Sequence, residues 1–472
     1  MVSAIFTLIC LGGIAGAPRA TAASPEPIGI EGARHLLARA GLGGTPDEFA
    51  RFAVLDRRAA VKALFTAADR PQPPPPEWTT VVEPRRRRSD MTPEERRRAL
   101  EQSRERGEEL KIWWYQRMIQ TDRPLVERMT LFWHNHFTSS LQKVKLPLLM
   151  YRQNELFRAH SCGNFRTLLH AVAKDPAMLI YLDTVVSNRE QPNENFAREL
   201  LELFTLGEGH YRERDIKEAA RAFTGWKVDP RTGDFQLVRA RHDVGPKSFL
   251  GRQGNLGGEQ IIDILLEQPR LARFIVAKLW REFLSTEPVA DDVERIAQTF
   301  RASGYELEPV IRALLESDAF WDPRERGAMI KSPVELLVGV ARTFQLPLGE
   351  GPALVRLGRS LQQDLFNPPN VKGWPGGPSW ISSTTLLIRE QTLAQIGNET
   401  QPRRTLEPDA GMSGSSVELL RAWFDAIDPK PEMRAAAAIA RLCPIPLVDP
   451  LTATDGVAII RQILVDPVYQ LK

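Results

Sequence analysis

Apolar side chains recur at three- and four-residue intervals over most of this chain, the spacing of one face of an α-helix. Thr45, Pro46 and Glu48 form a capping box, and we expect the helix that it starts to continue to about residue 65. Only residues 234–238 have the alternation of a β-strand. Further helices are expected at 32–40, 146–159, 164–174, 269–283, 293–303, 308–317, 333–344, 386–396, 417–426, 431–441 and 456–464. The pattern predicts a mainly α-helical fold with a small β-hairpin-like element and long ordered loops.

Composition divides the chain into parts. Residues 24–400 are expected to form the main helical domain, and residues 401–472 a C-terminal helical extension. A Pro/Arg-rich insertion at about 67–110 interrupts the main domain with a run of prolines at 73–76 and a run of arginines at 85–88. We interpret this insertion as an exposed, semi-rigid linker followed by a solvated helix. The alternative is that its arginines contact an acidic partner or an anionic lipid.

The first residues have the pattern of a leader. An apolar run at 4–14 precedes the small residues Ala20, Thr21 and Ala22, which resembles the core and cleavage site of a signal peptide spanning residues 1–23. The stretch before the run contains no Lys or Arg, and a buried N-terminal helix is the alternative. No later run reaches the ~18 apolar residues of a membrane span. We therefore expect an exported protein, periplasmic or extracellular, with no transmembrane span in the mature chain.

Charge and cysteine content narrow the classes of function. The 62 Lys and Arg residues nearly balance the 59 Asp and Glu residues, for a net charge of +3, so no nucleic-acid partner is expected. One of the three cysteines, Cys10, lies in the leader. Cys162 and Cys443 could pair, but two cysteines make neither a disulfide framework nor a zinc site.

Two histidines lie in the sequence FWHNHF at 132–137. The flanking apolar residues have helical spacing, so at ~100° per residue the two imidazoles point in nearly opposite directions and do not clamp one metal ion. His136 falls within the apolar stripe, and His134 falls at its border. His136 is either a core histidine satisfied by a hydrogen bond or a buried base or ligand.

Carboxylates interrupt the next apolar stretch, which begins at residue 196. A helical wheel places Glu199 within the apolar arc, Thr205 on the opposite side and Asn195 and Glu202 at one border. A buried carboxylate needs a partner. That partner is either a cation, such as Lys217, Arg221 or a remote Arg, or a histidine, His136 or His242. With a histidine, Glu199 and Glu202 could transfer protons or bind a divalent metal.

Two loops supply the remaining candidates. His242 and Asp243 lie in a turn-rich segment and could contribute a ligand or a base. The stretch 367–380 contains four prolines and three glycines, which predict a loop of fixed shape. In it Lys372, Trp374 and Trp380 are candidate binding residues. The two indoles could stack on a sugar or pack against the helical body. The chain has no nucleophile elbow, phosphate loop, dinucleotide fingerprint or His-Glu-x-x-His motif.

Six segments together resemble the bacterial family known as domain of unknown function 1800. They are RHLLARAGLGGTPDE, LFWHNHFTSS, PNENFARELLELFTLGEGHY, DIKEAARAFTGW, HDVGPKSFLG and PPNVKGWPGGPSWISSTTLL, which fall between residues 32 and 391. Arg212 stands where such proteins usually have the Thr that caps the second helix. The resemblance implies a mainly helical, often exported protein. It also implies a partner, because genes of this family frequently neighbour those of the unknown-function 1501 family, which is similar to sulfatases and alkaline phosphatases.

Three functions are compatible with these features. The first is an exported accessory protein or binding partner of the sulfatase-like protein. The second is a hydrolase, metal-dependent or using acid/base chemistry, with a pocket around His136, Glu199 and Glu202. The third is a carbohydrate-binding module that uses Trp374 and Trp380. No standard catalytic signature favours the second over the first.

Overall fold

The computed structural model describes residues 26–66, 71–80, 91–346, 351–396 and 416–472. Helices make up most of these residues, which confirms the mainly α-helical prediction. None of the described helices combines the length and apolar composition that a bilayer crossing requires. The expected leader at 1–23 and the arginine run at 85–88 lie outside the described residues.

The helices are joined by connections of very different length, the longest at residues 223–257. From the N-terminus they are α1 (Gly29–Ala40), α2 (Pro46–Ala53), α3 (Arg57–Leu64), α4 (Pro93–Gln120), α5 (Pro124–His136), α6 (Leu141–Val144), α7 (Pro147–Ala159), α8 (Phe165–Lys174), α9 (Pro176–Tyr181), α10 (Asn195–Glu199), the π-helix η4 (Leu200–Thr205) and α11 (Glu213–Ala222). The remainder are α12 (Gly258–Glu267), α13 (Pro269–Phe283), α14 (Ala290–Ala302), α15 (Leu307–Leu315), α16 (Asp318–Trp321), α17 (Pro333–Phe344), α18 (Pro352–Ser360), α19 (Ser383–Gln395), α20 (Ser416–Ala426), α21 (Arg434–Leu442) and α22 (Gly456–Val465). Short 3-10 turns are η1 (Glu77–Thr79), η3 (Thr184–Val186), η5 (Arg239–Arg241), η6 (Pro323–Glu325), η7 (Gly377–Trp380), η8 (Pro431–Met433) and η9 (Pro467–Gln470).

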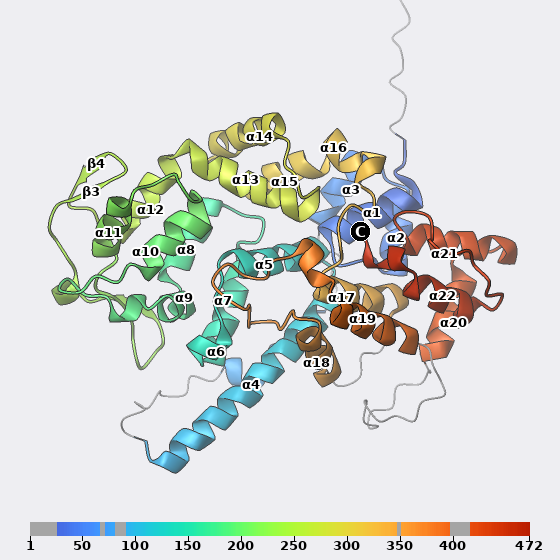
Figure 1. Cartoon of the computed structure of the whole chain (residues 1–472), viewed down its shortest axis with the longest axis horizontal. Helices are drawn as coiled ribbons and strands as arrows, with labels where there is room; N and C mark the ends of the chain where they lie inside the picture. The colour runs from blue at the N-terminus through green and yellow to red at the C-terminus, as the bar shows by residue number, and fades with distance from the viewer. Residues whose placement is uncertain (1–25, 67–70, 81–90, 347–350, 397–415) are drawn as a thin grey trace, which may run out of the picture.

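α5 lies at the centre of the molecule, where α1 and α7 pack against it (Figure 1). The main hydrophobic core includes its residues Leu125, Met129 and Trp133. α4 also enters this core, but only with its last turns, where Trp114 is fully buried. Its first turns extend away from the body, with charged side chains in solvent. α4 runs without a break through residue 110, where we expected the insertion to end.

The helix expected from residue 46 to about 65 is interrupted. α2 ends at Ala53, and α3 begins at Arg57. The side chain of Asp56 accepts a hydrogen bond from the backbone N–H of Ala59 at 3.0 Å and caps α3. An aspartate at this position favours a new helix start over continuation, because its oxygen satisfies a free backbone donor.

The β structure consists of two hairpins. β1 (Trp226–Val228) pairs antiparallel with β2 (Phe235–Leu237), which confirms the predicted strand. β3 (Lys247–Phe249) pairs with β4 (Arg252–Gly254), a hairpin that we did not predict. Its turn residues Leu250 and Gly251 both have positive φ, 45° and 83°. The usual sequence signal for such a turn is Asn-Gly or Asp-Gly, and Leu-Gly does not provide it.

The C-terminal helices form a second, smaller core. α20, α21 and α22 pack with α17 and α19 around residues such as Leu420, Ile460 and Ile463 (Figure 1). Cys443 is buried in this core, whereas Cys162 lies in the main one, and both are free thiols. The pairing left open by the sequence does not occur.

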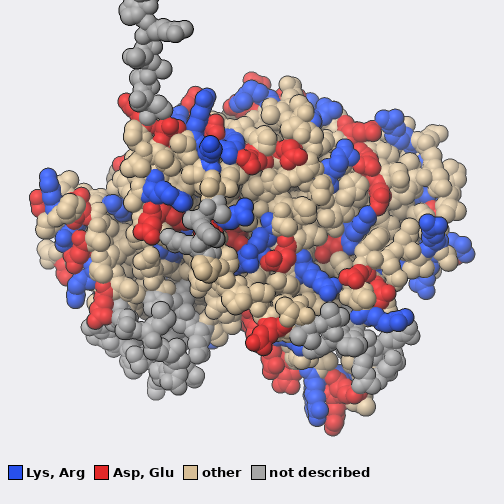
Figure 2. Space-filling model, turned by 180° about the vertical axis from the view of Figure 1, so that it is seen from behind, with Lys and Arg blue, Asp and Glu red and all other residues tan. Residues whose placement is uncertain are grey.

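Charged residues lie both on the surface and in the interior. On the face in Figure 2, basic and acidic side chains are interspersed. Inside, the fully buried Arg342 on α17 pairs with Glu48 on α2 at 2.7 Å and donates to the carbonyl of Thr121 after α4 at 3.0 Å. A buried arginine with its donors filled joins three helices in one geometry.

Candidate functional site

The C-terminal end of α5 is the place where three of the sequence motifs meet. The side-chain oxygen of Asn135 accepts a hydrogen bond from the backbone N–H of Trp374 at 2.7 Å, and its amide donates to the carbonyl of Trp374 at 3.5 Å. Gly373 has a φ of +81°, and a Cβ there would lie 2.6 Å from the Asn135 carbonyl oxygen. The loop therefore approaches α5 closely enough to require glycine.

His136 is buried beside the π-helix η4. Its Nε2 lies 3.1 Å from the carbonyl of Phe204, and Nδ1 lies 3.1 Å from Nζ of Lys278 on α13. Because a lysine ammonium only donates, Nδ1 is the acceptor and Nε2 carries the proton. Burial first, and then Lys278, lowers the pKa of His136 well below its ordinary value. The imidazole is therefore neutral, and both of its nitrogens are engaged.

The carbonyls at the end of η4 accept hydrogen bonds from His136 and from two cationic side chains. Lys278 also donates to the carbonyl of Leu203 at 3.2 Å, and Arg270 donates to that of Leu206 at 2.9 Å. The last carbonyls of a helix have no partner within it and carry partial negative charge, so cations stabilise them. Burial lowers the pKa of Lys278 to about 8. His136, Lys278 and Arg270 together cap the end of this helix.

The π-helix corrects our helical wheel. A π-turn bonds residue i to residue i+5 and so advances by less than the α-helical ~100° per residue. Thr205, which the wheel placed opposite the apolar arc, is fully buried and donates to the carbonyl of Leu200 at 2.5 Å. Leu203, an apolar residue of the same stretch, is only half-buried. The change of helix type was not visible in the spacing of apolar residues.

Glu199 lies half-buried at the start of the π-helix. Among the described residues its carboxylate makes no hydrogen bond or ion pair with His136, His242 or a cation. The pKa of Glu199 is raised by burial first and then by Glu202, whereas Arg198 and Lys372 act in the opposite direction. Of the cations expected to pair with Glu199, Arg221 binds Asp243 instead. Glu199 is therefore a carboxylate at a protein edge rather than within a core ion pair.

The residues around Glu199 form a polar edge. Glu202 accepts a hydrogen bond from the hydroxyl of Tyr211 at 3.2 Å. Burial, with Glu202 nearby, raises the pKa of Tyr211 to about 12. Asn195 donates to Asp183 at 3.2 Å, and Asp183 in turn pairs with Lys143 at 2.7 Å. Glu199 and Glu202 are thus neighbours on one edge, whereas His136 contacts Phe204 and Lys278.

His242 and Asp243 belong to a separate cluster that fixes a turn. His242 Nδ1 lies 2.8 Å from the carbonyl of Thr224, and Asp243 pairs with Arg221 at 2.7 Å. Asp243 also accepts from the backbone N–H of Gly245 at 2.8 Å. These contacts hold the segments AFTGW and HDVGPK together, because the polar groups of each segment bond to the other.

The proline-rich loop presents little aromatic surface. Trp374 is 4% exposed and Trp380 is 6% exposed. Stacking on a sugar requires an open ring face, so their burial argues for the packing alternative. Lys372 is exposed, and the electrostatic effect on Glu199 places it near the polar edge.

His134 was expected at the border of the stripe but is completely enclosed. Its ring contacts those of Trp114, Phe366 and Trp374, with centroids 5.3–5.7 Å apart. Among the described residues neither ring nitrogen has a hydrogen-bond partner. Burial lowers its pKa to about 3, so it is a neutral core residue at physiological pH. Nearly every position of α5 is buried, so the helix has no polar border at which His134 could lie.

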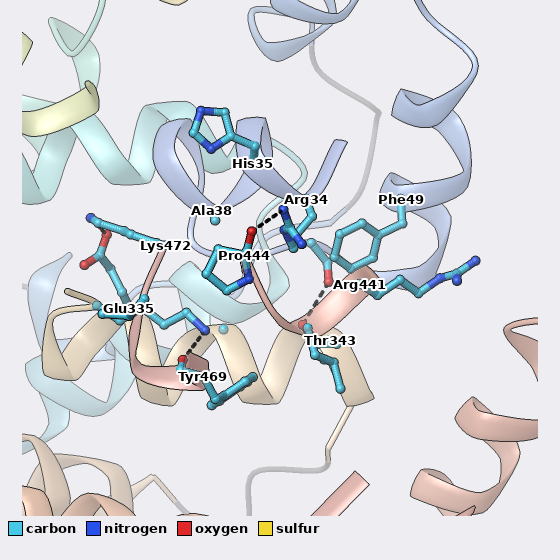
Figure 3. A pocket seen from close by; sticks show the side chains of 16 residues that line it. Arg34, His35, Ala38, Phe49, Glu335, Thr343, Arg441, Pro444, Tyr469 and Lys472 are labelled. Atoms are coloured by element: carbon cyan, nitrogen blue, oxygen red, sulfur yellow. Dashed lines mark hydrogen bonds and ion pairs between the residues drawn. The ribbon is translucent and has the colours of Figure 1, made fainter. Parts of the chain in front are cut away.

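A pocket that we did not predict lies between α1, α17 and the C-terminal segment, by which we mean residues 441–444 and 469–472. Its walls carry Arg34 and His35 of α1, Glu335 of α17, Lys331, and Lys472 (Figure 3). No local spacing pattern signals this pocket, because its residues are far apart along the chain. Elsewhere, no three His, Cys, Asp or Glu side chains within the described ranges are grouped so that they could hold a metal ion.

The comparison with known proteins agrees with the motifs. A family model described as "Protein of unknown function (DUF1800)" matches residues 35–470. This chain belongs to the DUF1800 family. No curated protein and no solved structure matches it. The DUF1800 match continues through the C-terminal helices, beyond the residues that carry the sequence resemblance.

In this DUF1800 protein the motifs are explained by contacts with one another. Asn135 of LFWHNHF holds the loop of VKGWPGG, and His136 caps the helix of ELLELF. The segments AFTGW and HDVGPK form a second such pair through His242 and Thr224. Arg212, at the place of a capping Thr, provides only its backbone N–H, which donates to Asp215 at 2.9 Å. The start of α11 therefore has the hydrogen bond to the Asp215 carboxylate but lacks the one that a Thr hydroxyl would accept.

Proposed function

We propose that this chain is an exported, non-catalytic helical protein that acts as an accessory or binding partner of a sulfatase-like protein. The observation that supports it best is the state of His136. A general base needs a free lone pair facing substrate. Both nitrogens of His136 contact protein atoms instead, at 3.1 Å each.

The polar edge supports the same proposal less directly. Glu199 and Glu202 lie together, but among the described residues neither carboxylate makes a hydrogen bond with a histidine, serine or cysteine. A hydrolase site needs a nucleophile or activated water held by a base in addition to a carboxylate. The carboxylates alone do not supply one.

Export and the partner rest on sequence. The apolar run at 4–14 with the small residues at 20–22 supports a cleaved leader. The sulfatase-like partner of the 1501 family follows from the gene neighbourhood implied by the family resemblance. In this proposal both proteins act outside the cytoplasm.

Co-purification tests the partnership. We expect a tagged 1501-family protein from the neighbouring gene to elute with this chain from a sizing column as a complex of defined mass by light scattering. Separate elution when both are mixed at concentrations near 50 μM, an affinity limit of about 6 kcal/mol, would contradict the partnership.

A reporter fusion tests export. Residues 1–30 fused to a reporter that is active only outside the cytoplasm should give activity, and the same fusion lacking residues 4–14 should not. Equal activity of the two fusions would overturn the assignment of the leader.

A second candidate is a hydrolase that uses the polar edge. The observation in its favour is the raised pKa of Glu199, a half-buried carboxyl without an ion pair, which is the state of a general acid. In that case wild-type protein would cleave aryl esters of sulfate, phosphate or acetate. Glu199→Gln would lower the rate by about 100-fold or more, and Glu194→Gln, which removes a surface pair with Arg198, would not.

The metal-dependent version of this candidate has its own measurement. Elemental analysis of the purified protein should find a stoichiometric divalent metal, and chelation should abolish the cleavage. No cleavage of any ester by wild-type protein, with and without added divalent ions, would exclude the hydrolase and leave the accessory role.

A further inference from the structure

The pocket between α1, α17 and the C-terminal segment has a cavity of about 50 Å³ that is partly open to solvent. Figure 3 shows Arg34 reaching into it from α1 and Pro444 of the C-terminal segment lying across it. The wall on the other side is formed by Lys331, Tyr469 and Lys472. A cavity of this size has room for a few water molecules or one small ion and is too small for a drug-sized ligand, whose sites measure about 300–1,000 Å³.

The charges on the wall do not balance. Glu335 is the carboxylate among the lining residues, and it is already paired with Lys472 and with Arg128. Arg34 and Lys331 have no carboxylate within ion-pair distance among the described residues. Arg441 also lines the pocket, but its guanidinium points away from it (Figure 3). Arg34 and Lys331 therefore face the pocket without an ion-pair partner among the described side chains.

Arg34 and Lys331 each have more N–H groups than the hydrogen bonds that they make to backbone carbonyls. Arg34 donates to the carbonyls of Ala440 at 3.2 Å and Pro444 at 3.4 Å, and to that of Cys443. Lys331 donates to the carbonyl of Tyr469 at 2.7 Å and lies 3.7 Å from the centre of its ring. A guanidinium has five N–H groups and an ammonium three. The carbonyls position the side chains but neither fill all donors nor neutralise the charge.

The electrostatics of the pocket agree with this geometry. Burial first, together with Arg34, Arg389 and Lys472, lowers the pKa of Lys331 to about 7, whereas Cys443 acts in the opposite direction. Burial lowers the pKa of Arg34 to about 10. His35 adds no charge, since its Nε2 lies 2.8 Å from the carbonyl of Phe320 and its pKa is lowered to about 3. An anion between the two cations would offset the cost of burying them.

We propose that this pocket binds a small, doubly charged oxyanion, inorganic phosphate or sulfate, between Arg34 and Lys331. Two uncompensated cations match a dianion, and their free N–H groups match its oxygens. Arg34 belongs to α1, whereas its carbonyl partners belong to the end of α21. The bound anion would therefore fasten the C-terminal segment to the main body.

Calorimetry of the full chain with sodium sulfate tests this proposal, at low chloride to limit screening. We expect saturable binding with one site. Lys331→Gln should weaken it at least tenfold, Lys331→Arg should keep it within about threefold, and Lys430→Gln, which removes an exposed lysine, should leave it unchanged. Phosphate should bind at the same site and compete with sulfate.

The pH dependence gives an independent readout. Sulfate stays doubly charged between about pH 6 and pH 9, so a change in its affinity reports on the protein. With the Lys331 pKa at about 7, affinity in wild-type protein should fall at least tenfold over that range. In Lys331→Arg it should stay nearly constant, because arginine remains charged.

Three results would overturn the proposal. One is no saturable binding of sulfate or phosphate by wild-type protein up to 10 mM, the range of about 3 kcal/mol. Another is equal affinity of a folded Lys331→Gln variant, with folding checked by circular dichroism. The third is tighter binding of succinate than of sulfate, which would make a dicarboxylate the ligand class instead.

Discussion

The end of α5 and the cation-lined pocket both bury polar side chains, but they balance them differently. At α5 the groups of Asn135, His136 and Lys278 meet backbone atoms or each other. In the pocket Arg34 and Lys331 donate to carbonyls, and no carboxylate within the described part of the chain forms an ion pair with either of them. A buried polar group with its partners inside the chain is part of the scaffold, whereas an uncompensated charge beside open space suggests a ligand.

This contrast makes the pocket a stronger candidate ligand site than the motif residues at the end of α5. The motif residues drew attention because they are polar within apolar stretches, and most of them fix backbone segments. The residues of the pocket wall drew none, because in sequence they look like ordinary surface lysines and arginines. The experiments below test whether the two regions differ as the contacts indicate.

The largest expected effect is at the α5 end. Gly373→Ala adds a Cβ against the Asn135 carbonyl at a φ of +81°, and should cost about 3 kcal/mol or more of unfolding free energy. Gly376→Ala has a similar φ of +73° but open space, so it should cost only about 1 kcal/mol. Denaturant titration measures both. Equal costs would show that the loop does not press on α5.

Lys278 gives a pH-dependent effect. Its pKa is about 8 in the folded protein and ordinarily 10.5, so above pH 8 the unfolded chain binds more protons at this site. The charged form of the buried Lys278 lowers the free energy of unfolding, and this cost is removed as pH rises from about 8 to 10.5. Wild-type protein should therefore gain on the order of 2 kcal/mol relative to Lys278→Met over that window. A constant difference between the two proteins would contradict a buried Lys278.

Lys331→Met should have a smaller effect of a different kind. Without added anion it removes an uncompensated charge together with one hydrogen bond, so stability should change by no more than about 1 kcal/mol. With excess sulfate the wild-type melting temperature should rise and that of the variant should not. Thermal melts with sodium chloride at matched ionic strength are the control, and equal shifts in both proteins would remove the contrast.

The smallest effects belong to the polar edge. Because the pKa of Glu199 is raised in the folded protein, its charged form costs stability as pH rises through that pKa. Glu199→Gln should then stabilise the protein at pH 7 by about 0.5 kcal/mol, and the gain should vanish at low pH. Glu194→Gln should instead destabilise by up to about 0.5 kcal/mol through loss of its pair with Arg198. The same sign for both would be inconsistent with the contacts.

Periodicity and capping residues were enough to predict the helical fold, β2 and most helices, since these depend on local spacing. The motifs were enough to predict the family. Two predictions from local pattern were wrong. Asp56 starts a new helix within a stretch predicted as one helix, and the π-helix places Thr205 in the core. Both errors arise where backbone hydrogen bonding changes without a change in hydrophobic pattern.

What the sequence by itself determined was the fold class, the family and the set of polar residues that must find partners in the interior. Only the tertiary structure decided which partners they have. His136 meets Lys278, which is 142 residues away, rather than Glu199, and Arg34 meets the end of α21, which is over 400 residues away. Pairings at such separations depend on how helices pack in three dimensions, and a spacing rule along one helix carries no information about them.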